Sequence, residues 1–118
     1  MAPEAVARAL AAEPRTLHED GRRLDQFLEI GFSVSYGAGD GTVEHVDTAE
    51  PAELEHNGLV IAAGQPLAQA LVALETRGEQ VVRIAPDLWI APRLGASIWA
   101  PADRIETAGA FGHPDYYE

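Results

Sequence analysis

The sequence predicts an α+β fold in which two tandem helix-plus-antiparallel-strand repeats form one antiparallel sheet with helices on one face. The chain of 118 residues has the length of a single domain, 1–118. Hydrophobic residues make up 47% of it and charged residues 23%, which is typical of a globular domain with one core. A pattern of glycine, serine and a β-branched residue occurs twice, first as Gly31, Ser33 and Val34 and later as Gly95, Ser97 and Ile98.

The first half of the chain predicts one helix followed by antiparallel strands. Residues 3–12 favour a helix because a proline stands in its first turn, Val6 and Leu10 lie four residues apart, and Pro14 ends the pattern. The glycine-rich stretch 37–41 favours a chain reversal between two strands. The strands expected from alternation are 22–30, 32–36 and 42–47.

The second half predicts the same order of elements. A polar connection with a turn at Asn57-Gly58 leads into it. An apolar stripe through Leu67 and Leu74 predicts a helix that starts after Pro66 and ends at Gly78. The strands expected here are 59–63, 79–85, 87–91, 94–100 and 104–111.

We therefore divide the domain into pseudo-repeats of about 2–51 and 58–114. One helix on a three-stranded meander leaves an open sheet edge and a thin core, whereas two copies can join their edges into a longer sheet. The helices would then cover one face, and the serine side of residues 30–36 would form the helix-free face. The same alternation places Trp99 on that helix-free face.

Several short motifs suggest a family. They are Asn57-Gly58, the segment 64–66 (Gly-Gln-Pro), the segment 92–99 (Pro-Arg-Leu-Gly-Ala-Ser-Ile-Trp) and the segment 114–118 (Pro-Asp-Tyr-Tyr-Glu). With the duplicated helix-plus-strand pattern, the chain resembles the β-lactamase-inhibitor-protein-like fold, and the motifs are similar to those of uncharacterised small bacterial cytosolic proteins. The resemblance implies the fold and a protein-binding surface, and it does not extend to β-lactamase inhibition. The inhibitors of that fold use disulfides, and this chain has no cysteine.

The charge balance restricts the partners. The net charge is −11, and all eight basic side chains are arginines. This disfavours nucleic acid and anionic membranes, because both are bound by clustered cations. No stretch has the length of a membrane span or the pattern of a secretory signal, so we expect a cytoplasmic protein. Between Arg23 and Arg77 there are nine acidic residues and no lysine or arginine.

The sequence predicts no catalytic residue, no metal site and no cofactor. His45 and His56 lie among acids, but their spacing matches no known metal motif. The glycine-rich stretch 37–41 lacks the lysine and the following helix of a phosphate-binding loop. Ser97 stands within a strand, without the sharp turn that presents a nucleophilic serine.

The leading hypothesis is a non-enzymatic protein-binding module, for example an immunity or inhibitor protein that meets a basic partner. Aromatic anchors within a charged rim are typical of interfaces. The expected contact residues are Phe27, Trp89, Trp99, Glu44, Asp47, Glu53 and Glu55.

Three alternatives remain open at this point. The connection 50–65 or the C-terminal tail can cover the two tryptophans as a second small core. The chain can instead be a small-molecule or metal-responsive module, or a minor enzyme, with a cleft between the repeats. The sheet face can also form a homodimer.

Overall fold

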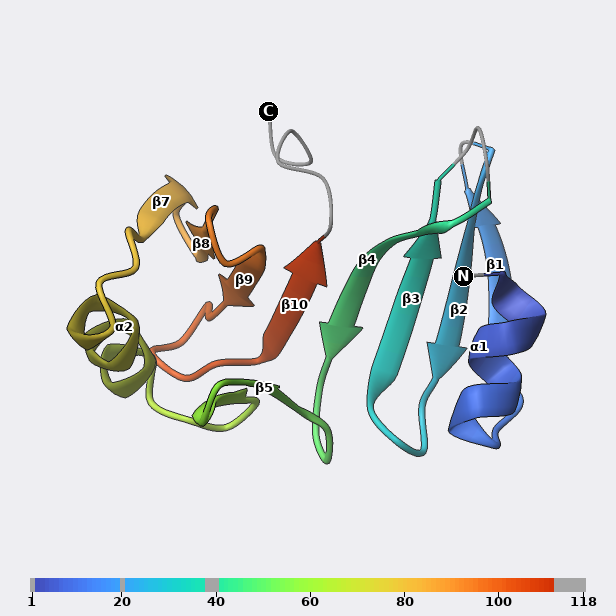
Figure 1. Cartoon of the computed structure of the whole chain (residues 1–118), viewed down its shortest axis with the longest axis horizontal. Helices are drawn as coiled ribbons and strands as arrows, with labels where there is room; N and C mark the ends of the chain where they lie inside the picture. The colour runs from blue at the N-terminus through green and yellow to red at the C-terminus, as the bar shows by residue number, and fades with distance from the viewer. Residues whose placement is uncertain (1, 20, 38–40, 112–118) are drawn as a thin grey trace.

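The computed structural model describes residues 2–19, 21–37 and 41–111 (Figure 1). The end of the second predicted repeat, the motif 114–118 and residues 38–40 of the glycine-rich stretch lie outside these residues. Over the described part, the chain forms ten strands and two helices. In chain order these are α1 (Pro3–Leu10), β1 (Arg15–Glu19), β2 (Arg22–Phe27), β3 (Phe32–Tyr36), β4 (Val43–Thr48), β5 (Glu53–His56), β6 (Leu59–Ala62), α2 (Leu67–Thr76), β7 (Val82–Ala85), β8 (Leu88–Ala91), β9 (Ala96–Trp99) and β10 (Thr107–Phe111).

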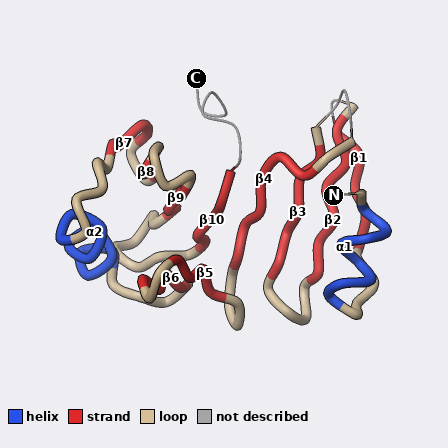
Figure 2. Tube along the Cα trace, viewed as in Figure 1, coloured by secondary structure: helices blue, strands red, loops and turns tan. Residues whose placement is uncertain are grey.

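Eight of the strands form one antiparallel sheet in the order β1-β2-β3-β4-β10-β9-β8-β7. The tube in Figure 2 shows β4 and β10, which are far apart in the sequence, side by side in the middle of this sheet. Their register places Val46 opposite Ala110 and Asp47 opposite Gly109. Strands β5 and β6 pair only with each other, as a separate two-stranded sheet.

The predicted α+β class, with two helix-plus-strand repeats and helices on one face, is wrong. The protein is mostly β, and its helices span only 8 and 10 residues. Figure 1 shows α1 at the β1 end of the sheet and α2 at the β7 end. Each helix packs on its own cluster of buried residues, so the helices do not form a common layer. The segments Arg15–Glu19 and Glu53–His56, for which no strand is predicted, are strands.

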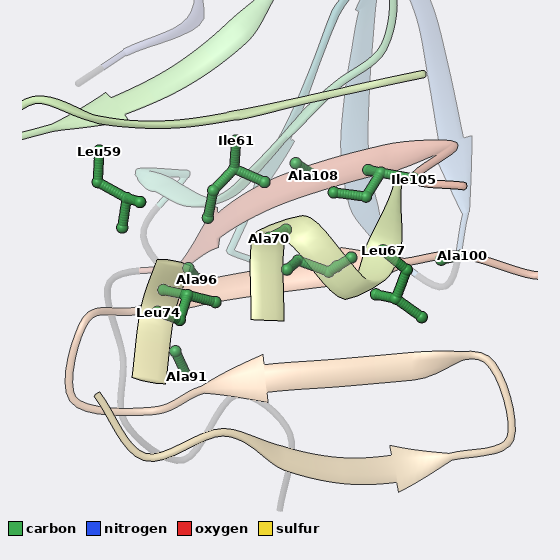
Figure 3. Packing of buried hydrophobic residues seen from close by; sticks show 11 residues of the cluster. Leu59, Ile61, Leu67, Ala70, Leu74, Ala91, Ala96, Ala100, Ile105 and Ala108 are labelled. Carbon is green, nitrogen blue, oxygen red and sulfur yellow. The ribbon is translucent and has the colours of Figure 1, made fainter. Parts of the chain in front are cut away.

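The larger core lies between α2, the β5–β6 hairpin and one face of the sheet. Figure 3 shows Leu67, Ala70 and Leu74 of the helix pointing into it. Leu59 and Ile61 contribute from β6. Small alanines supply much of the sheet side and let the covering elements approach closely; they are Ala91, Ala96 and Ala108. The repeat hypothesis expects only a helix over this part of the sheet, whereas the structure places the β5–β6 hairpin there together with α2.

The smaller core lies beneath α1 and consists of Val6, Phe27, Val34 and Tyr36. The register pairs Val34 with Asp25 on one side and with Val46 on the other, so these residues share the face that α1 covers. We call the face of the sheet that carries the buried residues of the two cores the covered face, and the opposite one the helix-free face. A row along the helix-free face contains Gln26, Ser33, Asp47, Gly109, Ser97, Ile90 and Val82.

Two glycines of the repeated sequence pattern have the same physical role. Gly31 and Gly95 both have positive φ, at 77° and 75°, just before a strand. A Cβ at Gly95 would come 2.6 Å from the carbonyl oxygen of Phe111, and one at Gly31 would meet the carbonyl oxygen of Ala49. The carbonyl oxygen of Gly31 accepts a 2.8 Å hydrogen bond from the backbone N–H of Ala49, and that of Gly95 accepts one of 2.8 Å from Phe111. Only glycine combines this backbone conformation with such close approach.

No helix in the described ranges is long and apolar enough to cross a membrane.

Candidate functional site

The three aromatic residues of the predicted contact surface do not come together. Phe27 is only 2% exposed and belongs to the core beneath α1, so its assignment to a partner-binding surface is wrong. Trp89 lies opposite Ile98 on the covered face, packed against the larger core. The guanidinium carbon of Arg83 lies 5.1 Å from the centre of its ring. Trp99 is 42% exposed on the helix-free face, as the alternation of residues predicts.

The connection 50–65 can therefore cover one of the two tryptophans at most. That connection forms the β5–β6 hairpin, which packs on the covered face. Trp89 is on the same face as the hairpin, and Trp99 points the other way. The C-terminal tail lies outside the described residues.

The four predicted acidic contacts divide into two groups. Glu44 accepts a hydrogen bond from Arg22 at 3.2 Å, and a carboxylate oxygen of Asp47 lies 3.5 Å from Nδ1 of His45. Glu53 and Glu55 alternate with Leu54 along β5, whose leucine faces the core. Both glutamates are exposed on the outer side of the hairpin.

On that outer side, Glu55 lies directly opposite the exposed Val60. We call Glu53, Glu55 and Val60 the hairpin face. In the part of the chain that the structure describes, neither glutamate forms an ion pair or a hydrogen bond through its side chain. The hairpin face therefore presents two carboxylates whose charge is not neutralised locally.

A second constellation, which sequence reasoning does not predict, spans three strands of the helix-free face. Ser97 on β9 has its Oγ 3.4 Å from Nε2 of His45 on β4, and Nδ1 of the same ring faces Asp47. Between them stands Gly109 of β10, and a Cβ there would lie 2.6 Å from an atom of each of the three side chains. Phe111 stacks on the imidazole, with the ring centres 6.4 Å apart and the planes at 6°. We call Asp47, His45 and Ser97 the polar array.

Burial sets the protonation state of the array. Burial lowers the pKa of His45, although Asp47 and Glu44 both act to raise it. Burial also raises the pKa of Asp47, against the influence of the histidine. The ring is therefore neutral at neutral pH. Because a carboxylate only accepts, this geometry assigns the ring proton to Nδ1 and leaves Nε2 to accept from the Ser97 hydroxyl.

The order serine, histidine, aspartate is that of a hydrolase triad, but the surroundings do not suit that chemistry. A nucleophilic serine has to be reached by a substrate carbonyl, and Ser97 is only 3% exposed. It stands within the strand Ala96–Trp99 and not on a turn. The array instead ties β4 to β9 across the side-chain gap at Gly109.

A third polar group is buried beneath α1. Asp25 is fully buried, and one of its oxygens accepts from Thr16 and Arg23, each at 2.9 Å. Its other oxygen and the hydroxyl of Tyr36 are buried and have no hydrogen-bond partner among the described residues. Burial, followed by the charge of Asp25, raises the pKa of Tyr36. This group lies under the helix, so a macromolecular partner does not contact it directly.

The cavity beneath the hairpin and the metal-ligating side chains of the described residues provide no further candidate site. A cavity of about 160 Å³ lies between the hairpin and the sheet, lined mainly by apolar residues such as Leu54, Ile61 and Ala96. Its polar lining includes His56, whose ring lies 3.2 Å from the side chain of Asn57. Within the described ranges, no group of three or more histidine, aspartate or glutamate side chains is placed to hold a metal ion.

Comparisons with protein-family models, with curated proteins and with solved structures find no match to this chain. The similarity to the β-lactamase-inhibitor-protein-like fold therefore stays a prediction from the sequence.

Proposed function

We propose that this protein is a non-enzymatic binding module of the immunity or inhibitor type, which meets a basic partner protein through the hairpin face. The observation that carries the proposal is the pair of exposed carboxylates, Glu53 and Glu55, on one side of β5. Across the hairpin, directly opposite Glu55, lies Val60, an exposed apolar side chain. Apolar contact surrounded by charge is a common composition of protein interfaces.

The distribution of arginines supports a basic partner. Five of the eight arginines are engaged within the chain: Arg22, Arg23, Arg77, Arg83 and Arg104. Arg22 and Arg23 bind carboxylates, whereas the other three donate to backbone carbonyl oxygens. These contacts leave the hairpin glutamates without a counter-ion among the described residues.

The overall charge acts in the same direction. A net charge of −11 on a chain of 118 residues attracts cationic proteins and repels anionic ones over distances longer than a contact. Such complementarity speeds association and selects the partner more than it adds to the final affinity. Binding should therefore weaken as salt screens the charges.

The buried position of Ser97 supports a function without catalysis. The polar array is the closest approach to catalytic geometry in the described residues, and its serine is out of reach of a substrate.

Isothermal titration with an arginine-rich peptide tests the proposal. We expect the double variant Glu53→Gln/Glu55→Gln to bind the peptide several-fold more weakly than the unchanged protein at low salt, with a smaller salt dependence. The matched control is Glu13→Gln/Glu29→Gln, which removes the same charge from exposed positions outside the hairpin. Equal weakening by both double variants would mean that only the net charge matters, and would refute the hairpin face as the binding surface.

A further inference from the structure

Strand β7 forms one edge of the eight-stranded sheet, and its outer side is open. It pairs with β8 on its inner side, and no segment in the described ranges pairs with it on the other. Figure 1 shows it at the end of the sheet opposite to β1. All four of its residues are exposed, with Val82 at 37% and Ile84 at 39%. An edge of this kind offers unpaired backbone N–H and C=O groups to another strand.

The usual protection of a sheet edge is only partial here: β7 has four residues, with a register shift between Arg83 and Ala85 and with Pro86 directly after it. Proteins guard edges with charged side chains or prolines that oppose pairing. The one charged residue of β7 is Arg83, and its guanidinium is turned back to the carbonyl oxygen of Pro86 and to the ring of Trp89. At the opposite edge, β1 has the exposed residues Arg15 and His18.

An apolar strip on the helix-free face leads to this open edge. Val82 lies opposite Ile90, and Leu88 lies opposite Trp99. These four side chains share one face, and both Val82 and Trp99 are substantially exposed. A strand added beside β7 would place every second side chain along this strip, next to Val82.

We infer that β7 is a docking edge for an extended basic segment of another protein, which adds to the sheet as a further antiparallel strand. The strip selects apolar residues at alternate positions of that segment. The net charge of the chain selects positive residues at the remaining positions of the segment. A charge of −11 repels a second copy of this protein and attracts a cationic segment. The edge is a separate surface from the hairpin face, so this inference goes beyond the proposed function.

The test is an NMR titration of the ¹⁵N-labelled full chain with a short peptide of alternating arginine and valine. The control peptide has the same side chains and charge, but all of its backbone nitrogens are methylated so that neither of its edges can donate. We expect the first peptide to shift the amide signals of Val82–Ala85 and to slow their hydrogen exchange. We expect the methylated peptide to bind at least about 10-fold more weakly, because the strand's hydrogen bonds are lost.

Matched variants separate the edge from general charge effects. Ile84→Lys places a cation on the open edge, whereas Val72→Lys makes the same change at an exposed position on α2. The peptide should bind Ile84→Lys several-fold more weakly than Val72→Lys.

Four results would overturn the inference. The first is equal binding of the two peptides, and the second is a set of shifts confined to the hairpin face, which would leave the proposed function standing alone. The third is a set of β7 shifts that depend on protein concentration without peptide, which would make a second copy the occupant. Absence of binding by either peptide at low salt would refute this inference and count against the proposed function as well.

Discussion

Replacement of Gly109 by alanine is the most direct perturbation of the polar array. The substituted Cβ would lie 2.6 Å from Oδ1 of Asp47, from Cε1 of His45 and from Oγ of Ser97. Ordinary van der Waals contacts of a Cβ begin near 3.4 Å, so each neighbour has to move by several tenths of an ångström. The φ angle of this glycine is not in the left-handed region, so the backbone itself accepts alanine.

The size of the effect depends on which neighbours can move. The Asp47 side chain is 44% exposed and can turn outward, whereas His45 and Ser97 are buried and held on both sides of β10. Overpacking of a well-packed site costs about 1–3 kcal/mol. Because two of the three neighbours cannot move away, we expect the loss of stability in Gly109→Ala to lie in the upper half of that range. For a domain of this size, a loss of about 2 kcal/mol lowers the melting temperature by about 8 °C.

Urea denaturation and thermal melting of Gly109→Ala measure this cost. The double variant Ser97→Ala/Gly109→Ala should recover part of the stability, because one of the three close contacts disappears. A Gly109→Ala protein that is as stable as the unchanged one, or more stable, would refute the close packing of β4, β10 and β9 around this residue.

Further predictions concern burial and protonation. Because the folded pKa of His45 lies below its unfolded value of 6.5, the unfolded chain binds the proton more tightly, and the free energy of unfolding should fall as pH drops below about 6.5. Denaturation across this window should show a smaller slope for His45→Asn, and an unchanged slope would argue against the buried neutral ring. Trp99→Ala should cost less than about 1 kcal/mol and Trp89→Ala about 2 kcal/mol or more, since only Trp89 packs against the core; equal losses in urea denaturation would contradict their placement on opposite faces. Tyr36→Phe removes a buried hydroxyl that has no hydrogen-bond partner among the described residues, so its free energy of unfolding should be unchanged or higher, whereas Asp25→Ala should destabilise by about 1.5–3 kcal/mol because it removes the charged acceptor of Arg23 and Thr16. A loss of more than about 1 kcal/mol in Tyr36→Phe would show that the hydroxyl has a partner.

Local patterns in the sequence predict most elements but not their role in the fold. The expected helix at 3–12 is the helix Pro3–Leu10, and the expected strand 32–36 is the strand Phe32–Tyr36. The strands β1 and β5 are missed because each has one apolar residue, Leu17 and Leu54, among polar ones. An edge strand and a small hairpin can be stable with so little apolar surface because their backbones pair with neighbours.

The aromatic residues of the predicted contact surface do not come together for a different reason, which is the choice of the buried side of a strand. In β2 and β8, alternation alone leaves two options, and the assignment of Phe27 and Trp89 to a contact surface places the aliphatic side of each strand in the core. The structure buries the other side, with Phe27 in β2 and Trp89 with Ala91 in β8, and leaves Leu88 on the helix-free face. In these two strands the aromatic ring, which buries more apolar area than a leucine, marks the core side, whereas in β9 the aliphatic Ile98 is buried and Trp99 is exposed.

The polar array depends on pairing between distant strands. His45 and Asp47 alternate on β4, which the sequence shows, but their proximity to Ser97 requires β10 to lie between β4 and β9 in one register. Local periodicity carries no information on that order. Gly109 is the available signal, since a glycine within a strand often marks a place where neighbouring groups approach closely.

The most direct test of the central claim, binding of a basic protein through the hairpin face, is a comparative capture experiment from native cell extract. The unchanged protein and Glu53→Gln/Glu55→Gln are immobilised in equal amounts, and the retained proteins are quantified by mass spectrometry at low and high salt. We predict that the unchanged protein retains a small set of basic proteins, which is depleted in the double variant and released by salt. Retention of the same proteins by both, or of a set that salt does not affect, would contradict the account.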